Sequence, residues 1–199
     1  MLNDHSDGVY GGLVQPPYRV GTGHDIHRLV EGCALVLGGV RVPSEVGFST
    51  HSDGDVLSHA LVDALAGAIA DGDLGTHFPE DDPDAQNARS LEFVEQFARH
   101  VRADGYEIAN VDCFVVLGTI KLRPHLDGMR RNLAEALDVD VKQVSVKARS
   151  NDGLGEEGQG QACAAWATVL IYPASDWGAV SSASAIGNAV SHTASKLRR

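Results

Sequence analysis

The sequence predicts an α/β protein, more closely an α+β sandwich in which helices pack on one face of a mixed β-sheet. Three segments repeat apolar residues with a helical period, and the other apolar segments are short extended runs. In chain order they read strands, helix, helix, strand, helix, strand, strand, an order typical of a sheet covered by helices on one side. Hydrophobic residues form 43% of the 199, which is enough for a core without disulfides.

The first half of the predicted domain starts with a strand over Tyr18–Thr22. Residues 34–42 follow as a short hairpin that turns at two adjacent glycines. Residues 54–70 carry an apolar stripe at helical spacing, and Ser52 or Asp53 is expected to cap that helix.

The second half begins with an amphipathic helix over Ser90–Ala103. Val111–Leu117 is nearly all apolar, which predicts a strand inside the sheet. Pro124–Leu137 is the third helix, with proline in its first turn. Val144–Ala148 and Ala162–Tyr172 are expected to be the last strands.

The ends of the chain differ in composition from this domain. Residues 1–17 end in two prolines and are expected to form a flexible leader, and residues 174–199 are rich in small residues and predict a flexible or weakly helical tail. Residues 18–173 are therefore expected to form a single domain.

Charge and cysteine usage restrict the function further. The net charge of −11 argues against nucleic acid or an anionic membrane as partner. No stretch resembles a membrane span, a signal peptide or a transit peptide. Cys33, Cys113 and Cys163 are odd in number and lie in apolar stretches, so buried free thiols and a cytoplasmic location are expected.

The stretch VGTGHDIHR places Asp25 and His27 two residues apart. Residues at this spacing on an extended chain project to the same side, so both can share one ligand. The pattern alone also fits an ordinary surface or core pair. Further on, HSDGDVLSHALVD places Asp55, His59 and Asp63 four apart along the predicted helix.

The helix dipole favours acidic residues near a helix N-terminus, which accounts for Asp55 but not for a histidine one turn later. Asp25, His27 and His59 would supply three ligands to a divalent cation and leave a fourth position open. That arrangement is typical of catalytic zinc. The lack of cysteine ligands suits a phosphate oxygen in the open position.

Three loops add polar groups, and each also fits an ordinary surface loop. Asp73 and Gly75 could hydrogen-bond a polyol. Lys121 and Arg123 follow the apolar strand and could bind phosphate. Ser150–Asp152 follow the next strand and could form a backbone nest for phosphate, with a carboxylate for a second cation.

The stretches GTGHDIHRL, LGGVRVP, HSDGDVLSHALVDAL, GDLGTHFP and VKARSNDGLG, together with the Lys121 loop, resemble the 2-C-methyl-D-erythritol 2,4-cyclodiphosphate synthase family over about residues 19–172. The resemblance implies conversion of 4-diphosphocytidyl-2-C-methyl-D-erythritol 2-phosphate to the 2,4-cyclodiphosphate, with release of CMP, in the non-mevalonate isoprenoid pathway. It also implies a homotrimer with sheets around the central axis and active sites between subunits.

Residue roles follow from the same resemblance. Zinc would be held by Asp25, His27 and His59, and a second cation, Mg²⁺ or Mn²⁺, by Asp152. His51 and Ser150 would be catalytic. The implied substrate-binding residues are Asp25, His27, His51, Ser52, Asp73, Gly75, Phe78, Asp82, Gly118, Lys121, Arg123, Arg149, Ser150 and Asp152.

Two positions depart from the family pattern. Many relatives have Thr-Thr-x-Glu where this chain has Arg149-Ser150-Asn151-Asp152, so the cation-binding carboxylate is one methylene shorter. Gln159 stands where relatives have an arginine near the trimer axis, so the anionic isoprenoid-like ligand of that cavity is not expected here.

Two other functions remain open from the residues alone. A zinc hydrolase would need a carboxylate base beside the metal, and Asp63 is the nearest candidate. A non-catalytic trimer would use the metal structurally, which an open coordination position argues against.

Overall fold

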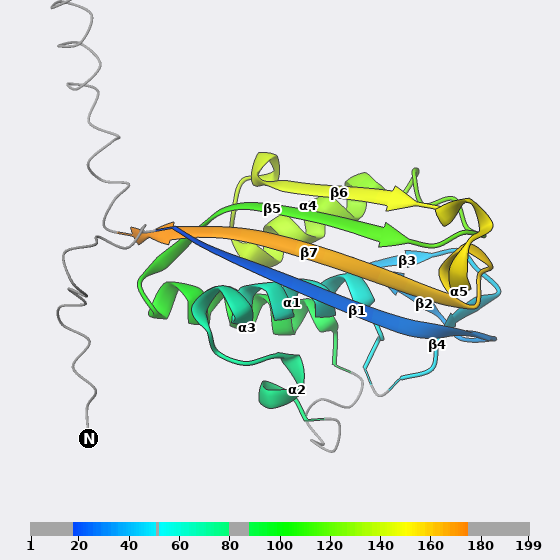
Figure 1. The fold of residues 1–199 in the computed structure, drawn as a ribbon, viewed down its shortest axis with the longest axis horizontal. Helices are drawn as coiled ribbons and strands as arrows, with labels where there is room; N and C mark the ends of the chain where they lie inside the picture. The colour runs from blue at the N-terminus through cyan, green and yellow to red at the C-terminus, as the bar shows by residue number, and fades with distance from the viewer. Residues whose placement is uncertain (1–17, 51, 80–87, 175–199) are drawn as a thin grey trace, which may run out of the picture.

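A five-stranded sheet and three long helices make up most of residues 18–50, 52–79 and 88–174, the part of the chain that this computed structural model describes (Figure 1). The strands are β1 (Arg19–Glu31), β2 (Leu35–Leu37), β3 (Val40–Val42), β4 (Val46–Phe48), β5 (Tyr106–Val116), β6 (Val144–Arg149) and β7 (Ala162–Pro173). The helices are α1 (Val56–Ile69), α2 (Leu74–His77), α3 (Ser90–Ala103), α4 (Leu126–Leu137) and α5 (Gly155–Gly158), with single 3₁₀ turns at Val141–Gln143 and Asn151–Gly153.

The sheet has the strand order β4-β1-β7-β5-β6. Only the β5–β6 pair is parallel, so the predicted mixed sheet is confirmed. The β2–β3 hairpin is also confirmed, and β5 is paired on both sides as its apolar run indicated. The predicted first strand was too short, because β1 runs on through the metal-ligand motif. The leader and almost all of the tail lie outside the described residues.

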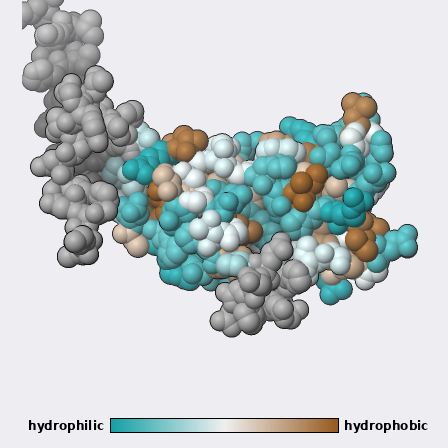
Figure 2. Space-filling view, turned by 60° about the horizontal axis from the view of Figure 1, so that its bottom comes forward, coloured by the Kyte–Doolittle hydropathy of each residue, from teal (hydrophilic) through white to brown (hydrophobic). Residues whose placement is uncertain are grey.

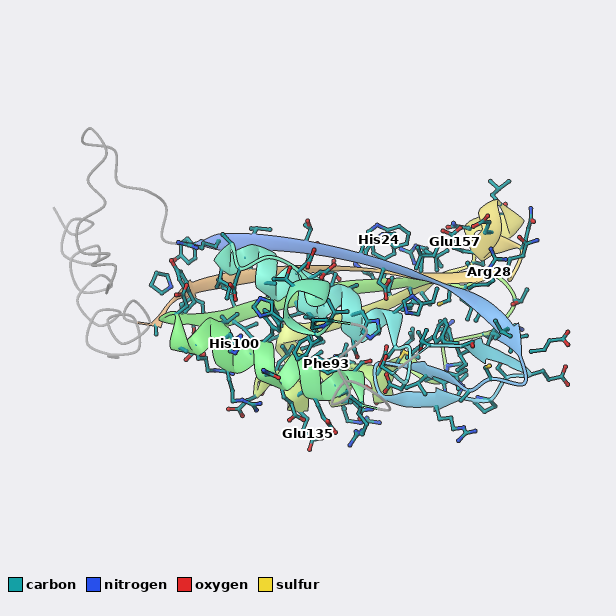
Figure 3. The ribbon with its side chains drawn as sticks, turned by 90° about the horizontal axis from the view of Figure 1, so that it is seen from below. His24, Arg28, Phe93, His100, Glu135 and Glu157 are labelled. Atoms are coloured by element: carbon teal, nitrogen blue, oxygen red, sulfur yellow. The ribbon has the colours of Figure 1, made fainter. Side chains whose placement is uncertain are left out.

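Helices α1, α3 and α4 lie on one face of the sheet, as predicted (Figures 1 and 3). The closest approach is between α1 and β1. A Cβ atom on Gly21 would lie 1.8 Å from the carbonyl oxygen of Ala64, and one on Gly23 would lie 2.0 Å from that of Ala60. Only glycine permits this contact, which explains why two glycines precede the Asp-x-His pair.

The long helices α1, α3 and α4 leave the opposite face of the sheet uncovered, and within the described ranges only the short helix α5 contacts β7 at one end of it. Val20 and Ile26 of β1 are exposed there, and Trp166 stacks on Phe114 with ring centroids 4.9 Å apart. Figure 3 shows His24 on this side, whereas Phe93 and His100 lie on the helix side. The face of the molecule in Figure 2 is mainly hydrophilic, with separate hydrophobic patches.

The cap of α1 differs from the prediction. Asp55, rather than Ser52 or Asp53, caps the helix, accepting hydrogen bonds from the backbone of Leu57 and Ser58 at 3.1 and 3.2 Å. The same buried carboxylate accepts the amides of the β2–β3 turn, Gly38 and Gly39, at 2.9 and 2.8 Å. Burial is the main reason that its pKa is raised. Asp55 therefore ties the hairpin to the start of α1, and its side chain does not join the metal-ligand cluster.

The thiols are free, and two of them are buried. Burial raises the pKa of Cys113 to about 12 and that of Cys163 even further, so neither thiol is nucleophilic near neutral pH. Cys33 is only half-buried, contrary to the prediction. None of the helices in the described ranges has the length and apolar character needed to cross a bilayer.

Candidate metal centre and active-site pocket

Strand β1 and helix α1 bring Asp25, His27 and His59 together. The two carboxylate oxygens of Asp25 face different rings, with Oδ1 lying 3.3 Å from Nδ1 of His27 and Oδ2 lying 2.9 Å from Nδ1 of His59. One ligand atom from each residue lies within 4.8 Å of the other two. The predicted triad is thus assembled in space, although His59 lies 34 residues after Asp25 in the chain.

A hydrogen-bond chain orients the His59 ring. The hydroxyl of Ser90 makes a short hydrogen bond to Asp53, a carboxylate that can only accept. The hydroxyl must therefore accept from Nε2 of His59, 2.9 Å away. In the neutral ring this leaves the lone pair on Nδ1, which points toward Asp25 and is available to a metal.

Sequence reasoning did not assign Ser90 or Asp53 to this site. Asp53 is in the HSDGDV motif, but its partner begins α3 and lies 37 residues further along the chain. The motif contained a signal for Asp53 as a polar residue next to the ligands. Nothing local pointed to Ser90.

The charge of the cluster favours a cation. Burial opposes ionisation of Asp25, but interactions with the facing imidazoles of His27 and His59 outweigh it and hold the pKa of Asp25 well below its usual range. An ionised carboxylate facing two imidazole nitrogens at 2.9–3.3 Å is a donor set that fits a divalent metal ion. The residues present can therefore hold one.

The cluster opens into a pocket of about 640 Å³. Ser52 and Phe78 also line it, and Phe78 stacks on Phe93 with ring centroids 4.2 Å apart. Residues of this pocket that the sequence analysis did not name are Ile26, Arg28, Val30, Ser49, Thr50, Leu74, Pro79 and Phe93. His51 and Asp82, both predicted to contact substrate, lie outside the described residues.

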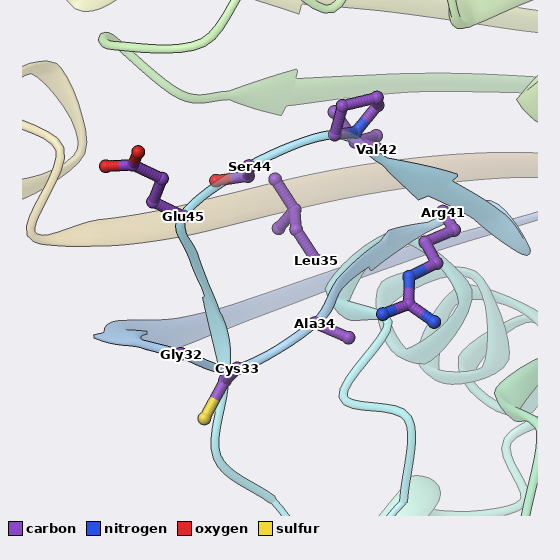
Figure 4. A pocket seen from close by; sticks show the side chains of 9 residues that line it. Gly32, Cys33, Ala34, Leu35, Arg41, Val42, Ser44 and Glu45 are labelled. Atoms are coloured by element: carbon purple, nitrogen blue, oxygen red, sulfur yellow. The ribbon is translucent and has the colours of Figure 1, made fainter.

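A second cavity, of about 490 Å³, lies between the start of β2 and the β3–β4 connection (Figure 4). Its charged lining residues are Arg41 and Glu45, and it contains none of the predicted site residues. The candidate active site is therefore the larger of these two cavities, the one that contains the metal-ligand cluster.

Asp73 and Gly75 are close to the pocket in sequence but do not line it. Asp73 caps α2 and accepts the backbone amide and hydroxyl of Thr76 at 2.8 and 2.7 Å, bonds that lower its pKa. Asp63 accepts the amide of Leu74 at 2.8 Å, and burial is the main reason that its pKa is raised. Both carboxylates thus hold the α1–α2 connection in place.

The remaining predicted residues gather at a different edge. Strands β5 and β6 are parallel, so the loops that follow them leave the sheet together, and the amide of Leu117 donates to the carbonyl of Arg149 at 3.0 Å. The end of β6 and these loops carry Gly118, Lys121, Arg123, Arg149, Ser150 and Asp152, none of which lines the 640 Å³ pocket.

The backbone of these loops has two notable features, a close contact at Gly118 and a turn at Ser150–Asp152. Gly118 packs so tightly that a Cβ atom would lie 2.1 Å from the carbonyl oxygen of Gly158. Asn151 and Asp152 both adopt positive φ, 52° and 53°, after Ser150 in the right-handed region. A right-handed residue followed by a left-handed one turns successive amides toward one side, the geometry of an anion-binding nest.

Comparison with known proteins agrees with this geometry. Residues 18–172 match the model of the YgbB family. A relative from Synechococcus sp. (strain JA-2-3B'a(2-13)) named 2-C-methyl-D-erythritol 2,4-cyclodiphosphate synthase is 50% identical, covering 77% of this chain and 98% of the relative. A Bacillus subtilis (strain 168) relative of the same name is 43% identical, covering 77% and 98%.

Solved structures give the same result. One called 2C-methyl-D-erythritol-2,4-cyclodiphosphate synthase superposes with a TM-score of 0.72 at 36% identity, covering 77% of this chain and 99% of that one. Another, IspF of Plasmodium falciparum in a CDP complex, has a TM-score of 0.69 at 32% identity and covers 78% and 96%. The chain therefore belongs to the YgbB family, together with relatives named 2-C-methyl-D-erythritol 2,4-cyclodiphosphate synthase.

Proposed function

We propose that this protein converts 4-diphosphocytidyl-2-C-methyl-D-erythritol 2-phosphate to 2-C-methyl-D-erythritol 2,4-cyclodiphosphate and CMP, as a phosphorus–oxygen lyase of the non-mevalonate isoprenoid pathway. Family membership supports the reaction. The observation that carries it is the Asp25–His27–His59 cluster opening into the 640 Å³ pocket, which fits a metal-bound phosphate.

Asp25, His27 and His59 would hold the metal, which we assign as zinc because imidazole and carboxylate ligands with one open position suit that ion. When bound, the ion supplies Lewis-acid stabilisation to a phosphoryl group. The protein has little covalent work to do in phosphoryl transfer, since the attacking 2-phosphate is already a nucleophile. Its residues need to hold two phosphates in line and to stabilise their charge.

The other assigned roles are contacts with the substrate. Ser52 and Phe78 would border the bound substrate, and Asp73 and Gly75 would hold the erythritol hydroxyls. His51 would contact the reacting phosphates, and Asp82 would be a further substrate contact. Ser150 would donate to the transition state from the nest-like turn after β6. Gly118, Lys121, Arg123 and Arg149 would bind the cytidine diphosphate part, and Asp152 would hold Mg²⁺ or Mn²⁺. A CDP complex of a structural relative supports that class of ligand.

We further propose that each active site lies between two subunits of a homotrimer. The phosphate-binding loops after β5 and β6 do not line the pocket of their own chain, so a neighbouring copy would supply them. The uncovered sheet face, with exposed Val20 and Ile26 beside the Trp166–Phe114 stack, would face the trimer axis. Residues 18–173 would be the catalytic domain, in the cytoplasm, with residues 1–17 and 174–199 as its leader and tail.

The test is incubation of the purified protein with the substrate and Mg²⁺, followed by phosphorus NMR. Formation of CMP and the cyclic diphosphate in equal amounts is expected. A linear phosphomonoester beside CMP would instead indicate hydrolysis. Intact substrate with zinc fully bound would contradict the proposal.

A further inference from the structure

A second group of metal-ligand side chains lies apart from the Asp25 cluster. Asp71 follows the C-cap of α1, His77 is the last residue of α2, and His100 is in the last turn of α3. One ligand atom from each lies within 4.8 Å of the other two. None of the three lines the 640 Å³ pocket, so the proposed reaction does not account for them.

The rings of this group are held in place by a buried phenyl group. His77 and His100 both pack edge-on against Phe97, with ring centroids 4.8 and 5.2 Å away. Phe97 is fully buried, so it restricts the orientation of both imidazoles. Rings fixed by packing lose little conformational freedom when they bind a ligand.

A loop contact explains two of the three residues. Nε2 of His77 lies 2.7 Å from the carbonyl oxygen of Asp71 and 3.3 Å from its Oδ2, which would close the α1–α2 connection without any ion. This contact does not involve His100, whose ring makes no hydrogen bond within residues 18–50, 52–79 and 88–174. One nitrogen of the His100 ring lies within 4.8 Å of a carboxylate oxygen of Asp71 and a ring nitrogen of His77, and the loop contact does not explain its position.

We propose that Asp71, His77 and His100 form a second binding site for a divalent transition-metal ion of the zinc class. Two imidazoles and one carboxylate are ligands that this class prefers. Nε2 of His77 would release its proton to solvent and bond to the ion in place of the Asp71 carbonyl. The exposed side of the cluster leaves room for water as a fourth ligand, because Asp71 is exposed and both histidines are half-buried.

The site would fasten α2 to α3. Phe78 follows His77 directly and stacks on Phe93 at the border of the active-site pocket. An ion joining His77 to His100 would therefore restrain the segment that carries Phe78. An ion that binds only the folded chain also raises its stability in proportion to the logarithm of the ion concentration.

Zinc counting on the full chain tests the proposal. Wild type and variants are dialysed against buffer at one fixed free Zn²⁺ concentration, and bound zinc per chain is measured by mass spectrometry. His100→Gln and Asp71→Asn are each expected to bind one zinc fewer than wild type. His125→Gln, which removes an imidazole outside both clusters, should bind as many as wild type.

Two further variants separate this site from the active site. His59→Ala should still bind zinc at the Asp71–His77–His100 site, and the His59→Ala/His100→Gln double variant should not. This difference is expected whether or not the protein turns over substrate. Circular dichroism checks that each variant is folded, and Asp71→Asn, which preserves side-chain size, serves if His100→Gln is not. Wild-type zinc content in both His100→Gln and Asp71→Asn would overturn the proposal.

Discussion

Ser90→Ala tests whether the hydrogen-bond chain behind His59 prepares that ring for a metal. The hydroxyl of Ser90 joins Nε2 of His59, 2.9 Å away, to the carboxylate of Asp53. Without it the ring loses the acceptor that keeps its proton on Nε2. Loss of such an outer partner costs about 10- to 100-fold in metal affinity, and we expect that loss for zinc at this site.

The substitution should also lower the free energy of unfolding of the metal-free protein. It removes one hydrogen bond to a carboxylate, worth about 1.5–3 kcal/mol, and one to a neutral ring, worth about 0.5–1.5 kcal/mol. Asp53 keeps the backbone amide of Ser90 at 3.2 Å, so the total should be near the lower end, about 2–3 kcal/mol. Denaturant unfolding of chelator-treated protein measures this change.

Ser58→Ala is the matched control. Its hydroxyl donates to the buried carboxylate of Asp55 at 2.8 Å, so the expected loss of stability is similar, about 1.5–3 kcal/mol. Within the described residues the ring of His59 bonds to Asp25 and Ser90 and not to Ser58, so zinc affinity should stay at the wild-type value. Competition with a coloured chelator gives both affinities. Wild-type zinc affinity in Ser90→Ala, or an equal loss in Ser58→Ala, would refute the reasoning.

Three further predictions concern the same region. His59→Ala should lose the active-site zinc and turnover together, by metal analysis and product assay; full occupancy of that site would show the ligand assignment to be wrong. Gly23→Ala places a methyl group about 2.0 Å from the Ala60 carbonyl and should prevent α1 from seating on β1, seen as loss of cooperative thermal unfolding; a wild-type melting curve would contradict the packing. The pKa of Asp25 is lower in the folded than in the unfolded chain, so its ionised form stabilises the metal-free protein above pH about 4, and this contribution is lost as the pH falls further. Asp25→Asn should therefore make the free energy of unfolding fall less steeply as the pH is lowered below about 4. The same steepness as in wild type would argue against the pKa shift.

The sequence predicted the long elements well because their periodicity is local. The helix Ser90–Ala103 begins and ends where its apolar stripe indicated. The sequence did not predict α2 or β4, since a segment of three or four residues is too short to show a hydrophobic period. The wrong N-cap of α1 has a tertiary cause, because the Gly38 and Gly39 amides hold Asp55 at that position.

In the candidate metal centre, too, the residues in local patterns could be predicted and those placed by tertiary packing could not. Asp25 and His27 share one side of a strand, and the HSDGDV stretch places a histidine on the next helix, so the ligands could be predicted from short patterns. Ser90 could not, because its role depends on α3 packing beside α1. The predicted phosphate loops lie at a separate edge of the same chain, a separation that only the strand order reveals.

The most direct test of the account asks whether one active site uses two subunits. His59→Ala removes the metal side of the site, and Lys121→Ala removes a cation from the loop side, so each variant alone should be nearly inactive. The two variants, with different tags, are co-expressed in equal amounts so that their chains mix in one trimer. About one quarter of the subunit interfaces would then combine an intact metal side from one chain with an intact loop side from the other. Phosphorus NMR should then show about that share of wild-type cyclic diphosphate formation, whereas a mixture no more active than its parents would contradict the shared site.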